Sequence, residues 1–302
     1  SAMTEEGKMT ESRAFHNKPL KSSGMWLDVW RQARRNRAAV AGIIILGILI
    51  FVAIAAPLLA PHDPYEMDLR DALKPPGTPG HILGTDELGR DTLSRLIYGS
   101  RISLTVGLIV VGIAGSIGVV LGAISGYYGG VADFVIMRTV DLLLAFPFLV
   151  LAIAVVSVVG ASLTNMMIVL GAVSWISYAR LVRGLVLSLR EEEFVVAARV
   201  VGVRNWQIIL RHILPNTLGV VVVQATFGVA MAILAASALS FLGMGAQPPT
   251  AEWGAMLSTA KKNMRQHPML AIAPGLAIMI TVLAINFVGD ALRDALDPRL
   301  RI

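Results

Sequence analysis

The sequence contains no cysteine among its 302 residues, and charged side chains make up only 15% of it. The absence of cysteine excludes disulfides, thiol nucleophiles and zinc sites with cysteine ligands. The scarcity of charge argues against an ordinary soluble domain, in which about 25% of residues are charged. Hydrophobic residues instead reach 55%, and mean hydropathy is +0.69. The composition therefore indicates an integral membrane protein.

Motifs for catalysis are also missing. The sequence has no phosphate loop of the form G-x-x-x-x-G-K-[ST], no H-E-x-x-H zinc motif and no G-x-S-x-G nucleophile turn. Its five histidines are dispersed. His62 and His81 share a loop with Asp86, Glu87 and Asp91, but no pair has the helical spacing of metal ligands, so we expect solvated or structural roles there. We predict no enzyme activity, no metal site and no cofactor in this chain.

Six apolar stretches are long enough to cross a membrane. About 20 helical residues span the roughly 30 Å of hydrocarbon, at 1.5 Å per residue. We predict an all-α polytopic membrane protein with six transmembrane helices, at 38–60, 102–132, 133–160, 165–186, 217–243 and 268–289. The chain would then consist of a tail at 1–37, a transmembrane domain at 38–292 with a polar loop at 61–101, and a tail at 293–302.

Small and charged residues within these stretches predict how the helices pack. Gly118, Gly122 and Gly126 recur at every fourth position, a pattern that lets two helix backbones approach closely. Arg138 and Asp141 lie three residues apart near a membrane entrance, where charges need partners. The sequence leaves two roles open for them, a local ion pair or a contact with a gate or with a cytoplasmic loop.

Later stretches hold a few isolated polar groups. Arg180 and Arg183 lie near one end of the fourth stretch, from which their long side chains can reach the headgroup region. Gln224 and Ser237 are the sparse polar residues of the fifth stretch. They are candidates to line a transport pathway, and hydrogen bonds between helices are an equal alternative.

The most distinctive segment is hydrophilic and runs from Arg190 to Asn216 between apolar stretches. Apolar residues recur in each half at i, i+3, i+4 and i+7, first as Phe194, Ala197, Ala198 and Val201, then as Trp206, Ile209, Leu210 and Ile213. This spacing predicts two short amphipathic helices. Gly202 suits a left-handed turn between them, and Asn205 suits the N-cap of the second. Pro215 predicts that the second helix ends or bends there.

The distribution of basic residues predicts an orientation. Six crossings place both termini on one side of the membrane. If that side is cytoplasmic, 18 of the 26 lysines and arginines lie inside. Because basic residues favour the cytoplasmic side, we expect cytoplasmic termini, and the loop at 187–216 then also lies in the cytoplasm.

Several motifs together resemble one protein family. Ala197-Ala198, Gly202 and Leu214-Pro215 are similar to the cytoplasmic loop of permease subunits of ABC importers, although Val196 stands where that pattern usually has Glu. The resemblance extends from Arg31 onward through LGTDELGRDTLSRLIYGSRISL, DLLLAFP, LSFLGMGAQPPTAEWGAML and GDALRDALDPRL. As a set, these runs resemble the second permease subunit of dipeptide, oligopeptide, glutathione or nickel importers.

This resemblance implies a function and a set of partners. The chain would pair with a paralogous permease, two ATPase subunits that hold ATP and Mg²⁺, and an extracytoplasmic solute-binding protein, in a bacterial inner membrane. The loop at 187–216 would contain the coupling helix, and alternating access would follow ATP binding. The expected docking residues are Phe194, Ala197, Ala198, Gly202 and Trp206, with Pro215 closing the loop.

Other functions remain as alternatives. A secondary carrier or channel is the main one, although the membrane charges are too few and too peripheral for an ion relay. A non-transporting structural subunit is another. Nucleic acid is not an expected partner, because the helical hairpin is flanked by membrane stretches and its arginines are offset by three glutamates. The substrate stays open among dipeptides, oligopeptides, glutathione and nickel.

Overall fold

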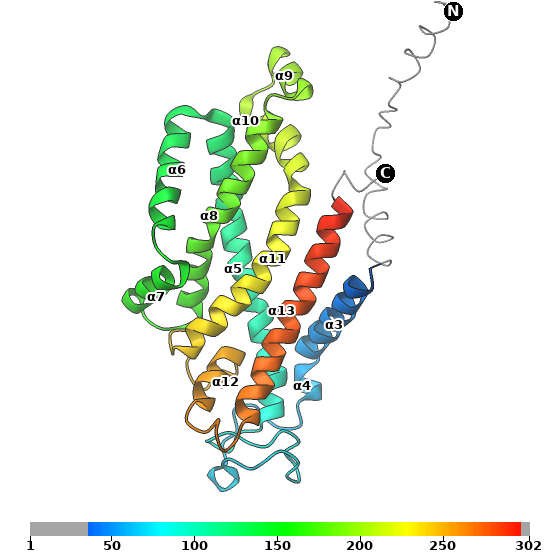
Figure 1. Ribbon diagram of the computed structural model, residues 1–302, viewed down its shortest axis with the longest axis vertical. Helices are drawn as coiled ribbons and strands as arrows, with labels where there is room; N and C mark the ends of the chain where they lie inside the picture. The colour runs from blue at the N-terminus through cyan, green and yellow to red at the C-terminus, as the bar shows by residue number, and fades with distance from the viewer. Residues whose placement is uncertain (1–35, 297–302) are drawn as a thin grey trace, which may run out of the picture.

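A computed structural model describes residues 36–296, which form a helical bundle with no named strand (Figure 1). The predicted all-α class is thus confirmed. Five segments are long and apolar enough to cross a membrane, and a bent helix pair makes up to six. The crossing helices are α3 (Arg37–Ile54), α5 (Thr92–Tyr128), the pair α6 (Gly130–Leu144) and α7 (Phe148–Val159), α8 (Leu163–Leu189), α11 (Leu214–Phe241) and α13 (Met269–Leu296). The predicted tails fall almost wholly outside the described residues.

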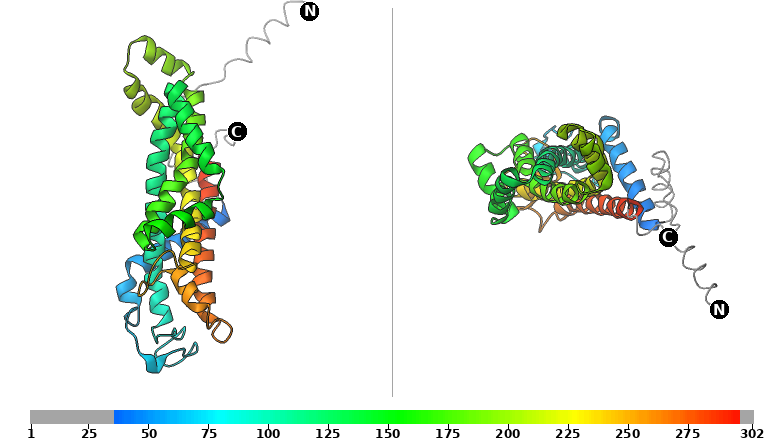
Figure 2. Two further views of the ribbon diagram at one scale, coloured as in Figure 1. Left: turned by 90° about the vertical axis from the view of Figure 1, so that its left-hand side faces the viewer. Right: turned by 90° about the horizontal axis from the view of Figure 1, so that it is seen from above.

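The helices are arranged around α5 (Figures 1 and 2). α5 packs along α8 on one side and against α11 on the other, while α3 and α13 lie together at the edge of the bundle. α3 runs away from the end that carries α9 and α10, and α13 runs back toward that end. Since α5 has 37 residues and rises about 1.5 Å per residue, it is longer than a bilayer is thick and extends into water.

The predicted glycine stripe is confirmed, and α8 is the helix that packs on it. A Cβ atom at residue 122 would lie 2.5 Å from the carbonyl oxygen of Ala179, and one at 118 would lie 2.6 Å from that of Trp175. At 126 the corresponding distance to the Cβ of Val186 is 2.8 Å. Any larger residue would therefore push the two backbones apart.

The third predicted crossing is not a straight helix. α6 and α7 meet at 92°, across a break at residues 145–147. Pro147 has no N–H to continue the helical ladder, and it disfavours helical geometry at Phe146. The two helices together bring the chain from the hairpin end back to the start of α8 (Figure 1).

The sequence predicts that the preceding helix ends or bends at Pro215, and it does not end there. Residues Asn205–Phe241 form one continuous candidate span, composed of α10 (Asn205–Ile208), a π-helical turn η3 (Ile209–Ile213) and α11. The widened turn immediately precedes Pro215, which takes a place in the first turn of α11, where its missing N–H does little harm.

The end opposite α9 is closed by the loop at 60–91 and by α12 (Trp253–Ala260). The short helix α4 (Ala56–Leu59) leads into this loop, and the 3-10 turn η2 (Leu69–Asp71) lies within it. α5 begins at Thr92, earlier than the predicted 102, because Asp91 caps it by accepting from the N–H of Ser94. Trp253 joins α12 to α5 by donating from Nε1 to the carbonyl of Leu96 at 3.0 Å.

Candidate functional site

The predicted amphipathic hairpin, residues 190–216, forms a protrusion at one end of the bundle (Figure 1). Its first helix, α9 (Glu193–Val200), ends in a left-handed turn at Gly202, whose φ is +84°. The N–H of Gly202 bonds to the carbonyl of Arg199 at 3.1 Å, and that of Val203 bonds to the carbonyl of Ala198 at 3.0 Å. This pair of bonds is a complete Schellman motif, so the left-handed turn predicted at Gly202 is confirmed.

The hairpin has an inner and an outer apolar face. Val195 and Ile208 are fully buried against Val182 and Val186 of α8, and Ala198 packs partly against the same cluster. Most of the apolar face predicted at Phe194, Ala197, Ala198 and Val201 is therefore turned away from the bundle. Val195, which the sequence analysis did not single out, is the residue of α9 that is fully buried against it.

The outer face is unusually apolar for a segment in water. Phe194 is 42% exposed, Trp206 51% and Val201 83%, and Ala197 is also exposed. Exposed apolar groups gathered on a short protrusion indicate a surface that meets a partner. Four of the expected docking residues lie on this outer surface: Phe194, Ala197, Gly202 and Trp206. The other two do not, because Ala198 is half-buried and Pro215 lies in the first turn of α11.

Two hydrogen bonds and one cation–π contact fasten the hairpin to the end of α5. The hydroxyl of Tyr127 donates to Oδ1 of Asn205 at 3.0 Å, and the Arg199 guanidinium lies over the Tyr127 ring, 5.7 Å from its centre. Arg190 donates to the carbonyl of Gly126 at 3.1 Å. The predicted N-cap role of Asn205 is wrong, since Arg204 occupies that position and the Asn205 side chain is used in this tether.

Arg183 makes an ion pair rather than reaching toward headgroups as expected. Its guanidinium forms two bonds, at 2.5 and 2.8 Å, with the two carboxylate oxygens of Asp133 in α6. Asp133 also accepts from Ser125 of α5 at 2.5 Å. Three helices are thus joined at the level just below the hairpin, which makes this end of the bundle a connected unit.

A cavity of about 310 Å³ lies between α5, the corner of α6 and α7, α8 and α11. Its walls are mostly apolar, with Gln224, Ser174, Ser177 and Tyr178 as polar members, and none of the lining residues within 36–296 is charged. Of the four candidate pathway residues, only Gln224 lines this cavity. Ser237 is buried beside Gly254 of α12 and lines a separate groove between α11, α12 and α13.

The local pair between Arg138 and Asp141 was one of the two roles that the sequence left open, and no ion pair joins them among the residues described. Arg138 instead lies over the ring of Phe134, 5.2 Å from its centre. Neither residue lines the cavity. Tyr178, which the sequence did not single out, does line it, and its hydroxyl packs directly on Gly228 of α11.

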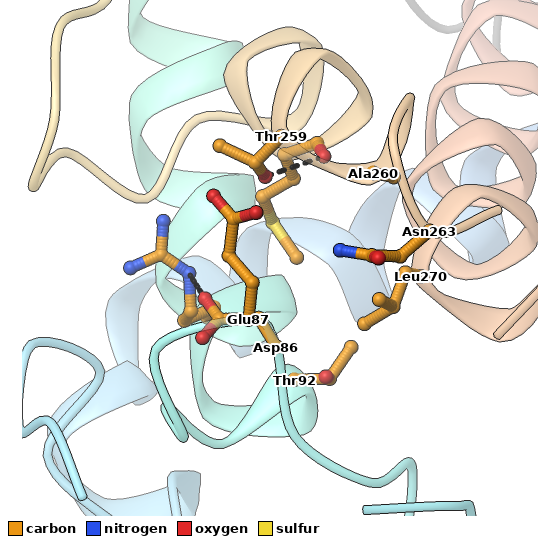
Figure 3. A pocket seen from close by; sticks show the side chains of 9 residues that line it. Asp86, Glu87, Thr92, Thr259, Ala260, Asn263 and Leu270 are labelled. Atoms are coloured by element: carbon orange, nitrogen blue, oxygen red, sulfur yellow. Dashed lines mark hydrogen bonds and ion pairs between the residues drawn. The ribbon is translucent and has the colours of Figure 1, made fainter. Parts of the chain in front are cut away.

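The opposite end of the bundle holds a second, polar pocket (Figure 3). Glu87 of the loop points toward Thr259 of α12, while Asp86 is turned toward Arg95 and pairs with it at 3.5 Å; Asn263 also lines the pocket. Its volume is about 10 Å³, enough for about one water molecule. The pocket therefore joins the loop to α12 and is too small to admit a solute.

Comparison with known proteins explains this arrangement. The family described as "Binding-protein-dependent transport system inner membrane component" matches residues 118–302, and that described as "N-terminal TM domain of oligopeptide transport permease C" matches residues 24–76. The chain belongs to this permease family. It is accordingly a membrane component of a transport system and not an enzyme by itself.

Relatives of the permease resemble it along nearly its whole length. The dipeptide transport system permease protein of Alkalihalophilus pseudofirmus is 46% identical, with 91% of this chain and 90% of the relative covered. The glutathione transport system permease protein of Pectobacterium atrosepticum is 45% identical, with 91% and 92% covered. The dipeptide permease of Haemophilus influenzae is 44% identical, with 91% and 95% covered.

The fold of the permease also has a solved counterpart. An inward-facing structure of the MetNI methionine ABC transporter matches with a TM-score of 0.54 and 18% identity, covering 68% of this chain and 98% of that one. At this level of identity the match shows the ABC permease fold, in agreement with the family assignment.

Proposed function

We propose that this permease is one of two paralogous membrane subunits of an ATP-driven importer of dipeptides or short oligopeptides, and that the hairpin receives the motion of the ATPases. The observation that carries the proposal is the apolar outer face of the hairpin at residues 194, 197, 201 and 206. Such a face in water costs free energy unless a partner covers it. A groove on an ATPase subunit is the partner that the family supplies.

The hairpin has the connections of a lever. Asn205 begins a helical segment that continues without a break through η3 into α11, and α11 lines the cavity. Tyr127 and Arg190 tie the hairpin to α5, which also lines the cavity. A displacement of the hairpin would therefore move two walls of the cavity together, as alternating access requires.

The chemistry of the cavity favours a neutral, peptide-like solute. Gln224 offers both a donor and an acceptor for an amide, and Tyr178 adds a hydroxyl. Bare divalent cations prefer charged or imidazole ligands, and the described residues that line the cavity include none. Peptides, including glutathione, therefore fit better than free nickel. The names of the relatives, dipeptide and glutathione permeases, support this choice.

The remaining parts of the system follow from the same proposal. ATP and Mg²⁺ would be bound by two separate ATPase chains, and an extracytoplasmic binding protein would deliver the solute. The positive-inside bias favours cytoplasmic termini in a bacterial inner membrane, with the hairpin on the same side. The transmembrane domain at 38–292, its outer loop at 61–101 and the coupling loop at 187–216 then have the sidedness expected from the sequence.

Reconstitution tests the proposed function. The permease would be purified with its paralogue, the ATPases and the binding protein, and placed in liposomes with ATP inside. Uptake of labelled dipeptide should require ATP and both ATPase chains. Uptake that persists without the ATPases would support a secondary carrier and contradict the proposal. Glutathione and a nickel chelate, offered in parallel, would rank the substrates.

A further inference from the structure

The loop at 60–91 brings together three potential metal ligands that the sequence analysis expected to act separately. His62 follows α4, His81 lies later in the loop, after η2, and Asp91 directly precedes α5. One ligand atom from each side chain lies within 4.8 Å of the other two. Sequence spacing could not show this, because a non-helical loop folds back on itself to join these residues.

The side chains already face one another. Nδ1 of His81 lies 2.9 Å from Oδ1 of Asp91, and Nδ1 of His62 lies 3.9 Å from Oδ2 of the same carboxylate. The two imidazole rings are stacked, with their centres 4.8 Å apart. Nδ1 of His62 is shielded from solvent and has no hydrogen-bond partner. A buried polar atom without a partner is costly, and a bound ion would satisfy it.

Asp71 completes the arrangement from behind His81. Its Oδ2 lies 3.5 Å from Nε2 of His81, on the far side of the ring from Asp91. Lys74 donates a hydrogen bond to Oδ1 of the same carboxylate, so Asp71 is held between Lys74 and His81. Histidine ligands in metal sites commonly donate their second ring N–H to such a carboxylate, which fixes the tautomer and the ring orientation.

The backbone around the site is held in place. Oδ2 of Asp91 accepts from the N–H of Ser94 at 2.8 Å and from its hydroxyl at 2.7 Å. The N–H of His62 donates to the same hydroxyl at 3.0 Å. His62 and Asp91 are therefore positioned by one residue of the first turn of α5. Such support is what a preorganised ligand set requires.

We propose that His62, His81 and Asp91 bind one divalent transition-metal ion of the zinc type, with Asp71 as the hydrogen-bond partner that orients His81. Two imidazoles and a carboxylate are typical ligands of Zn²⁺ at about 2.0–2.2 Å. Bonds of that length require His62, whose side chain is 38% exposed, to rotate slightly toward the other two. The ion would join the outer loop to the start of α5.

Metal binding is measured on the full-length chain, carrying a histidine-free affinity tag, with its co-purifying subunits in lipid nanodiscs. After removal of bound metal with a chelator and removal of the chelator, Zn²⁺ is titrated by equilibrium dialysis and metal analysis. The wild type should bind one more ion per permease than His62→Ala or His81→Ala. Asp71→Asn should weaken that site by about 10–100-fold.

His267→Ala is the matched control, because His267 precedes α13 at the same end of the bundle and is outside the cluster. It should bind Zn²⁺ as the wild type does. Should His81→Ala fail to fold, His62→Ala and Asp71→Asn still decide the question, since size exclusion and metal-free melting show whether they are native. Equal Zn²⁺ binding by the wild type and a folded His62→Ala would overturn the proposal, as would an equal loss in His267→Ala. The inference is independent of the transported solute.

Discussion

The hydroxyl of Tyr127, at the end of α5, donates a hydrogen bond to the side-chain oxygen of Asn205, at the start of the helix that continues into α11. The two residues are 78 positions apart in sequence. Their contact connects the base of the hairpin to the central helix of the bundle. If the hairpin transmits motion, this bond is one of the places through which it passes.

Tyr127→Phe should loosen that connection with little effect on the fold. One hydrogen bond contributes about 1 kcal/mol to stability, so the subunit should still assemble. We expect normal ATP hydrolysis by the complex but fewer solutes transported per ATP, measured in proteoliposomes. Tyr128→Phe is the control, because Tyr128 is 53% exposed and should behave as wild type. An unchanged transport ratio in Tyr127→Phe would show that the bond is not part of the coupling.

Gly202→Val should uncouple ATP hydrolysis from uptake. The φ of +84° at this residue is costly for a β-branched side chain, by roughly 1–2 kcal/mol. No atom lies within 4 Å of the position a Cβ would take, so the effect arises from the backbone and not from a clash within the chain. Gly202→Asn is the matched control, since Asn tolerates the left-handed region. Normal uptake by Gly202→Val, in a complex that reaches the membrane, would contradict the role assigned to the turn.

Gly122→Val should destabilise the pairing of α5 with α8. The added side chain would begin 2.5 Å from the Ala179 carbonyl oxygen, and overpacking of this kind costs about 1–3 kcal/mol. A lower melting temperature in detergent and less assembled complex are the expected results. Gly112→Val lies in the same helix with open space around the new Cβ, and it should melt as the wild type does. Equal melting of the two variants would argue against close helix packing at Gly122.

Gln224→Leu should weaken transport without disturbing coupling. The change preserves the size of the side chain and removes a polar group that lines the cavity. We expect a higher KM for peptide uptake, with the ATP consumed per turnover unchanged, in proteoliposomes that contain the complete system. Gln207→Leu, in the hairpin, is the control for the chemistry of the substitution. A wild-type KM in Gln224→Leu would place the solute elsewhere.

The burial of Glu252 leads us to expect that the stability of the protein depends on pH. Its burial at the N-cap of α12 raises its pKa, although the N–H groups of Gly254 and Ala255 donate to it. A raised pKa in the folded state means that the native protein binds the proton more tightly than the unfolded chain. Its contribution to stability is therefore full below about pH 4.5 and is lost as pH rises through the folded pKa.

Melting temperatures of the wild type and Glu252→Gln, compared from about pH 4 to pH 8, test that sign. The amide does not titrate, so the wild type should lose stability relative to the variant as pH rises. The variant also loses one cap acceptor, which shifts its whole curve but not the slope of the difference. The quantity compared is the melting temperature of the wild type minus that of Glu252→Gln. If this difference stays constant or rises as pH rises, folding does not raise the pKa of Glu252 and the prediction is wrong.

Much of the fold was predictable from the sequence, because the physical cause of each element is local. A bilayer requires long uncharged helices, so the runs of apolar residues identified the crossings near 38–60, 165–186, 217–243 and 268–289. The glycine stripe on α5 marked a helix contact for the same reason, since only small residues allow the backbones to approach. The left-handed turn at Gly202 likewise depends on one residue type.

Contacts between distant segments were decided only by the tertiary structure. The sequence could not reveal that Val195 and not Phe194 faces the bundle, because both fit a helical period and only the position of α8 separates them. Arg183 of α8 forms an ion pair with Asp133 of α6. The third crossing is bent by 92° between α6 and α7, at the break that contains Pro147. His62, His81 and Asp91 meet because a loop without helical period folds back on the start of α5. The local pattern of apolar residues determines which segments enter the membrane. Packing between distant segments determines which side chains meet, and the spacing of residues along the chain does not encode those contacts.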